Sequence, residues 1–165
     1  MPENSKRRHV FVSHHHKDDA AVTRLMALVK RRHYEFRNSS IRAKPANRER
    51  LEKGLVSDEK IRRLLRMKIS WAGSVIVLIG KQTHSRKWVN WEIQEAYRQG
   101  KRIVGVFDYG GTNANIPEAF KQYGSALVAW NADSIIDAID GIDHPFQNPD
   151  GTPAPPMHSR TVTVC

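Results

Sequence analysis

Cysteine is almost missing from this chain of 165 residues, since its single thiol, Cys165, is also the last residue. One cysteine cannot form a disulfide within the chain or a cysteine-rich zinc site. Long apolar runs are missing too, because the longest, residues 72–79, is far shorter than the roughly 20 residues that span a bilayer. The apolar run that follows the basic residues 6–8 covers only residues 10–12 and is too short for a secretory signal. We therefore expect a cytoplasmic protein with no membrane partner.

Glycine and acidic residues are missing where several α/β families need them. The residues after the first apolar run, 13–18 (SHHHKD), contain no glycine, which excludes a P-loop and a Rossmann dinucleotide site. Gly80 stands at the end of the third apolar run, where a phosphoacceptor receiver domain has an aspartate. Residues 81–85 (KQTHS) also lack the closely spaced acids of a Toprim-type nuclease.

Positive charge is concentrated in the first part of the chain. The formal net charge is +10, and residues 1–70 hold 19 Lys and Arg against 8 Asp and Glu, whereas residues 71–165 hold 8 against 9. A basic half is compatible with nucleic acid, an anionic ligand, an acidic partner surface or simply a solvated basic face. Charge alone leaves these interpretations open.

Short apolar runs alternate with amphipathic stretches along the chain. The runs predict strands at residues 8–13, 33–37, 74–79, 102–107 and 126–130, and the periodicity predicts helices that start near Asp19, Ser57, Lys87 and Asp133. The helix after Ser57 is expected to carry Ile61, Leu64 and Leu65 on one face. This pattern predicts a single α/β domain of three layers, with a five-stranded, mainly parallel sheet covered by helices on both faces, as in flavodoxin-like folds. It covers residues 1–143, and the Pro-rich residues 144–165 form an irregular strap or a disordered tail.

Ligands of such sheets bind beyond the carboxyl ends of the strands. Residues 13–18, 37–41, 81–88 and 108–115 are therefore the candidates for a site. Residues 85–93 (SRKWVNWEI) begin the helix that follows the central strand. Trp88 and Glu92 are four residues apart and share one face of it, so the indole partly desolvates the carboxylate. Glu95 is interpreted as a solvated surface acid.

Two of these motifs resemble those of TIR domains. The strand that ends at Ser13, with its polar loop and Asp18, resembles the opening TIR motif, and Ser85, Trp88 and Glu92 resemble the motif that carries the catalytic glutamate. The pairing of a His-His loop with Trp-Val-x-x-Glu looks most like the ThsB-type TIR-like family of the Thoeris anti-phage system. The resemblance spans roughly residues 8–140.

The resemblance implies cleavage of the nicotinamide–ribose bond of NAD, with Glu92 as the catalytic carboxylate and NAD as substrate rather than cofactor. It also implies an ADP-ribose-derived messenger, a cyclic isomer being one form, for a separate effector. Homo-oligomerisation on activation and a phage-derived trigger follow as expectations. The implied substrate-binding residues come from the strand ends and the motif helix: Ser13, His14, His15, Asp18, Arg37, Asn38, Ser40 and Trp88.

Other functions stay open from the residues alone. A TIR-like adaptor that assembles without turnover would use the same loop and helix. A nucleic-acid-binding module is less favoured, because the basic half lacks interleaved aromatic residues and any helix-turn-helix or finger pattern. The three histidines 14–16 lack a carboxylate or thiol at matching spacing, so we expect no metal site.

Overall fold

A parallel sheet of five strands organises the computed structural model, which describes residues 8–14, 19–34, 36–38, 58–81, 87–108, 110–142 and 146–154. The strand order is β2-β1-β3-β4-β5, and every neighbouring pair is parallel. The strands are β1 (Arg8–Ser13), β2 (Phe36–Asn38), β3 (Ser74–Ile79), β4 (Arg102–Phe107) and β5 (Ala126–Val128). This is the flavodoxin-like order, and the expected fold class is confirmed.

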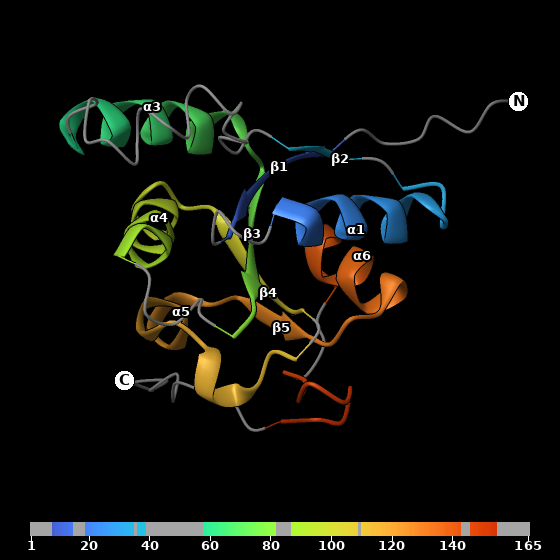
Figure 1. Cartoon of the computed structure of the whole chain (residues 1–165). Coiled ribbons are helices and arrows are strands. Elements are labelled where there is room, and N and C mark those ends of the chain that lie inside the picture. Colours follow the sequence, from blue (N-terminus) through green and yellow to red (C-terminus); the bar gives the residue numbers. More distant parts are fainter. Residues whose placement is uncertain are drawn as a thin grey trace, which may run out of the picture.

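Helices cover both faces of the sheet (Figure 1). One face packs against α1 (Asp19–Lys30) and α6 (Ala132–Asp140), and the other against α3 (Asp58–Trp71), α4 (Lys87–Arg98) and α5 (Glu118–Tyr123). Because side chains alternate along a strand, Val10 and Val12 join the first core cluster and Phe11 joins the second. Ser13 follows Phe11 in this alternation and therefore points to the α4 side.

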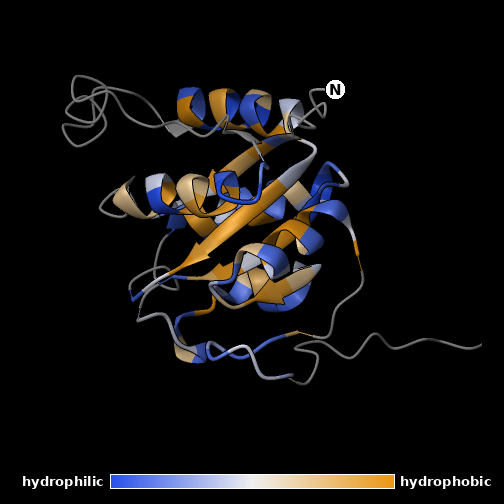
Figure 2. Ribbon diagram, turned by 90° about the vertical axis from the view of Figure 1, so that its right-hand side faces the viewer, coloured by the Kyte–Doolittle hydropathy of each residue, from blue (hydrophilic) through white to orange (hydrophobic). Residues whose placement is uncertain are grey.

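Both faces of the central strand are buried. Every residue of β3 is buried, which explains its unbroken apolar run. The hydropathy colouring shows the same pattern, with hydrophobic strands between helices of mixed polarity (Figure 2). None of the described helices is both long and apolar enough to cross a bilayer.

The structure differs from the sequence predictions, or adds to them, at three places. Strand β2 begins at Phe36 rather than residue 33, because α1 ends in a turn in which His33 adopts φ of 57° and the Tyr34 amide donates to the Val29 carbonyl. Leu64 is exposed on α3, whereas Leu65 is buried. Helix α5 was not predicted, since its six residues are too few to show a clear period.

Residues 146–154 lie against the edge of the sheet at β5. The Gln147 amide donates to the Leu127 carbonyl, and the Gln147 side chain accepts from the Ala129 amide. Phe146 packs on the α3–α4–α5 core cluster. These contacts cover part of an edge that would otherwise offer unpaired backbone groups. The division between a domain over residues 1–143 and a tail over residues 144–165 stays a prediction.

Gly111 holds the loop after β4 against the end of β3. A Cβ atom at this position would lie 2.1 Å from the carbonyl oxygen of Ile79. We therefore expect Gly111→Ala to lower the free energy of unfolding by roughly 3 kcal/mol, the upper part of the usual range for overpacking. Urea unfolding measures this change. Gly73→Ala is the matched control, because the nearest atom to its Cβ would be 3.7 Å away; equal stability of the two variants would contradict the prediction.

Candidate functional site

The candidate site lies where β1 and β3 end side by side. Helix α1 leaves the end of β1 over one face of the sheet, and α4 leaves the end of β3 over the other. Such a point, where neighbouring connections diverge, is the usual ligand site of an open parallel sheet. Ser13 ends β1 there, and Lys81 follows β3.

Glu92 is buried at the junction of α4 with the sheet. Only 8% of the residue is exposed, and its Oε2 atom is fully enclosed. Ser13, which is completely buried, faces it from the end of β1. Among the described residues, neither Ser13 Oγ nor Glu92 Oε2 has a hydrogen-bond partner of ordinary geometry. Two buried polar atoms without partners are rare in folded proteins and point to a functional role.

The environment of Glu92 favours its neutral form. Burial raises the pKa of the Glu92 carboxyl from its ordinary value of 4.5 to about 8, and the Ser13 hydroxyl lowers this pKa to a smaller extent. The two side chains form no hydrogen bond of ordinary geometry. The lowering of the Glu92 pKa by Ser13 therefore comes from a weak polar contact. Desolvation therefore dominates. A carboxyl with a strongly raised pKa at a ligand-binding edge is a candidate for a catalytic group.

Trp88 lies one helical turn before Glu92. It is half-buried and packs on the core cluster between the sheet and helices α3, α4 and α5. Its ring meets that of Trp91 edge to face, with the centroids 6.0 Å apart, and the Lys87 ammonium lies 5.4 Å from the Trp88 centroid. Trp88 and Glu92 both lie on α4, four residues apart, and so share one face of this helix. That the indole desolvates the carboxylate stays a prediction.

The other predicted substrate-binding residues are less well placed or lie outside the described residues. The ring of His14 donates from Nδ1 to the Val12 carbonyl at 3.0 Å. Strand β2 pairs Arg37 with His9 and Asn38 with Val10, so its backbone lies beside the first half of β1, short of the edge at Ser13. His15, Asp18 and Ser40 lie outside the described residues, and their roles stay predictions.

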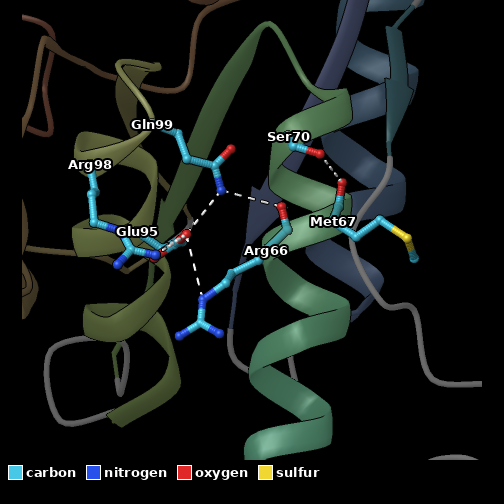
Figure 3. A network of polar contacts seen from close by, with 6 residues as sticks. All are labelled: Arg66, Met67, Ser70, Glu95, Arg98 and Gln99. Atoms are coloured by element: carbon cyan, nitrogen blue, oxygen red, sulfur yellow. Dashed lines mark hydrogen bonds and ion pairs between the residues drawn. The ribbon is translucent and has the colours of Figure 1, made fainter.

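Glu95 is buried, which contradicts its interpretation as a solvated acid. It is 6% exposed, and Arg98 Nη2 contacts both of its carboxylate oxygens at 2.9 Å. Gln99 donates to the same carboxylate at 3.0 Å and to the Arg66 carbonyl at 3.2 Å, and Arg66 Nε lies 3.8 Å from Glu95 Oε1 (Figure 3). Helix α3 thus covers this carboxylate, whose role is to join α3 to α4.

An ion pair between α1 and the end of β4 was missed from the sequence. Arg24 Nη2 lies 3.4 and 3.5 Å from the two carboxylate oxygens of Asp108. Asp108 belongs to residues 108–115, one of the segments that the sequence predicted to contribute to a site. Its partner Arg24 is 84 residues away in the sequence. No local sequence signal connects positions so far apart.

A family model and one curated relative point to the same family. A family model described as "Thoeris protein ThsB, TIR-like domain" matches residues 11–112, which is more than half of the chain. A Bacillus cereus (strain MSX-D12) protein named "Putative cyclic ADP-D-ribose synthase ThsB1" is 31% identical over 74 residues, or 41% of this chain. The match spans 38% of that protein's length. The solved structure of the Clostridium botulinum CMP N-glycosidase BcmB matches with 16% identity and a TM-score of 0.39, covering 61% of this chain and 69% of that one.

Proposed function

The chain belongs to the family of TIR-like domains of the Thoeris protein ThsB, and on this basis we propose that it cleaves the nicotinamide–ribose bond of NAD with Glu92 as the catalytic carboxylate. The observation that carries the proposal is the Glu92 side chain. It is a buried carboxyl with one oxygen that has no hydrogen-bond partner among the described residues, and it lies beside Ser13 and one turn from Trp88 at the carboxyl edge of the sheet. The name of the Bacillus cereus relative, which refers to cyclic ADP-D-ribose synthesis, supports the same substrate.

A single carboxylate suffices for this reaction. The nicotinamide of NAD is already cationic, so it leaves as a neutral molecule when the C1′–N1 bond breaks and its electron pair moves to the ring nitrogen. No general acid is needed, in contrast to the pair of carboxylates in ordinary glycosidases. The ionised Glu92 stabilises the positive charge that develops on the ribose, and burial strengthens that interaction.

The nucleophile that attacks C1′ determines the product. Water gives ADP-ribose and releases a proton, whereas a nucleophile within the same molecule gives a cyclic isomer. We propose that the product is an ADP-ribose-derived messenger for a separate effector, in anti-phage defence. Homo-oligomerisation and a phage-derived trigger belong to the same proposal, because an unregulated enzyme would drain the NAD of an uninfected cell.

Product analysis tests this function directly. The protein is incubated at high concentration with NAD, with and without phage-infected lysate. The products are separated by chromatography and their masses are determined by mass spectrometry. We expect nicotinamide together with an ADP-ribose species whose mass identifies the nucleophile. NADH is the matched control substrate, because its dihydronicotinamide is neutral and a poor leaving group. It should remain intact.

Two results would contradict the proposal. Equal loss of NAD and NADH would indicate a reaction at the diphosphate or an unrelated contaminant. Complete survival of NAD in both conditions would favour a TIR-like adaptor that assembles without turnover.

A further inference from the structure

A second charged cluster lies at the carboxyl edge of the sheet, on the face opposite Glu92. Val104 and Val106 of β4 pack with α1 and α6, and Phe107 packs on the other side. Asp108 follows in this alternation and therefore points to the α1 side, where Arg24 meets its carboxylate at 3.4 Å. The guanidinium is thus held directly beside the end of β4.

Lys81 lies at the same edge, next to the turn that follows Asp108. A Cβ atom built on Gly110 would lie 3.0 Å from Cε of Lys81 and 3.9 Å from its Nζ, so the lysine side chain runs along Gly110. Gly110 has a φ of 75°, which other residues rarely adopt. Glycine therefore lets the ammonium approach the backbone of this turn.

Hydrogen bonds fix the backbone around Asp108 and Lys81. The Asp108 amide donates to the Ile79 carbonyl at 3.0 Å, and the Gly111 amide donates to the Asp108 carbonyl at 2.9 Å. The Asn115 side chain donates to the Lys81 carbonyl at 3.0 Å. The loop after β4 is therefore tied to the end of β3 next to Lys81, and Arg24 reaches this loop from α1 through its contact with Asp108.

Among the described residues of this edge, the Arg24–Asp108 pair and Lys81 together leave an excess of one positive charge. Arg24 and Lys81 are cationic, and Asp108 supplies a single carboxylate. The Arg24 side chain is 53% exposed, against 10% for Asp108. Exposed ion pairs contribute little stability, so the guanidinium can accept a second anion at small cost. Both contacts with Asp108 run through Nη2, which leaves Nε and Nη1 outside this pair.

We propose that Arg24 and Lys81 bind the diphosphate of the dinucleotide substrate. The identity of the ligand rests on the proposed NAD cleavage, whereas the anion site rests on the cluster itself. A planar guanidinium suits two phosphate oxygens at once, and an ammonium supplies a compact charge beside it. A nucleotide that crosses the edge between β1 and β3 can place its nicotinamide ribose near Glu92 and its diphosphate on the Arg24 side of the sheet.

Calorimetric titration of the full chain with ADP and with adenosine tests the site without requiring turnover. We expect Arg24→Gln and Lys81→Gln each to weaken ADP binding roughly tenfold, the usual effect of losing one charge-assisted contact. Adenosine binding should stay unchanged. Arg32→Gln is the matched control, since Arg32, in the turn that follows α1, forms an exposed pair of the same length, 3.4 Å, with Asp133. It should bind ADP like the wild type.

Asp108→Asn separates anion binding from a merely structural role of the pair. Removing the carboxylate relieves Arg24 of its competing anion, so ADP binding should tighten if Arg24 binds the diphosphate. If the pair only fixes α1 to β4, this variant should behave like Arg24→Gln and lose stability without any gain in affinity. Thermal unfolding of every variant shows whether the fold is intact.

Three results would overturn the diphosphate site: no ADP binding by the wild type, equal binding by all variants, or equal losses for ADP and adenosine. These results are independent of NAD turnover. ADP binding that depends on Arg24 and Lys81 in a protein that leaves NAD intact would support the anion site and reject the proposed function. If the protein cleaves NAD and neither Arg24→Gln nor Lys81→Gln changes ADP binding, the proposed function is supported and the anion site is rejected.

Discussion

Glu92→Gln is expected to reduce NAD cleavage by at least about 10²–10³-fold, the loss that follows removal of one group that stabilises charge in a transition state. Glutamine has nearly the same shape as glutamate, so it fills the same buried position beside Ser13. It cannot carry the negative charge that stabilises the oxocarbenium-like ribose. The fold should remain intact, because the resting structure already favours the neutral form of this carboxyl. Nicotinamide release under saturating NAD measures the effect.

Glu95→Gln is the matched control for this variant. Glu95 lies on the same helix, is buried to a similar degree and is also a carboxyl, but it contacts Arg98, Gln99 and Arg66 instead of the ligand-binding edge. Its replacement should preserve most of the turnover. It should lower the free energy of unfolding by roughly 1–2 kcal/mol, less than for a fully buried pair because both arginines are partly exposed. If Glu92→Gln kept more than a tenth of the wild-type rate, Glu92 would not be the catalytic group.

Strands β1, β3 and β4 and the position of Glu92 on α4 could be predicted because they depend on local patterns. Strand β3 is apolar at nearly every position, since helices cover both of its faces, and the central strand was therefore located without error. Trp88 and Glu92 are four residues apart, and a helix places such residues on one face wherever it packs. The depth at which Glu92 is buried also depends on Ser13 and the strands beneath α4, which spacing alone does not show.

The remaining errors concern contacts between distant segments. Glu95 was interpreted as exposed because it lies one residue off the helix stripe that carries Trp88 and Glu92, whereas α3 packs alongside α4 and supplies Arg66 to its carboxylate. Arg24 and Asp108 meet only because the sheet brings the end of β4 next to α1. Such pairs are set by topology, and one sequence gives no direct signal of them. For β2, the capping turn at His33 overrode the strand preference of the residues that follow α1.

The stability of the wild type is expected to fall relative to that of Glu92→Gln as the pH rises from about 4.5 to about 8. The Glu92 carboxyl has a pKa of about 8 in the folded protein and 4.5 ordinarily, so in this range the folded state holds a proton that the unfolded state has released. Stability therefore decreases with pH, by about 1.4 kcal/mol per unit. The total approaches roughly 5 kcal/mol as an upper limit and is constant above pH 8. Below pH 4.5 both states are protonated, and the contribution of this group is fully retained.

Urea unfolding of both proteins at pH 5, 7 and 9 measures this difference. The variant has no proton to lose at residue 92, so subtracting its free energy of unfolding cancels the other titrating groups. The two proteins should be closest at pH 5, and the variant should be the more stable by several kcal/mol at pH 9. A difference that stays constant with pH would show that Glu92 is not buried as described.

The pKa of Glu92 should also govern catalysis, but activity should rise with pH where stability falls. Cleavage needs the ionised carboxylate, so kcat/KM is expected to rise about tenfold per pH unit and to level off near pH 8, since this parameter reports ionisation of the free enzyme. The cationic nicotinamide of bound NAD favours the charged form of Glu92. The profile of kcat should therefore level off at a lower pH than that of kcat/KM. Coincident profiles would mean that the nicotinamide does not lie beside Glu92, and the catalytic carboxylate would have to be sought elsewhere.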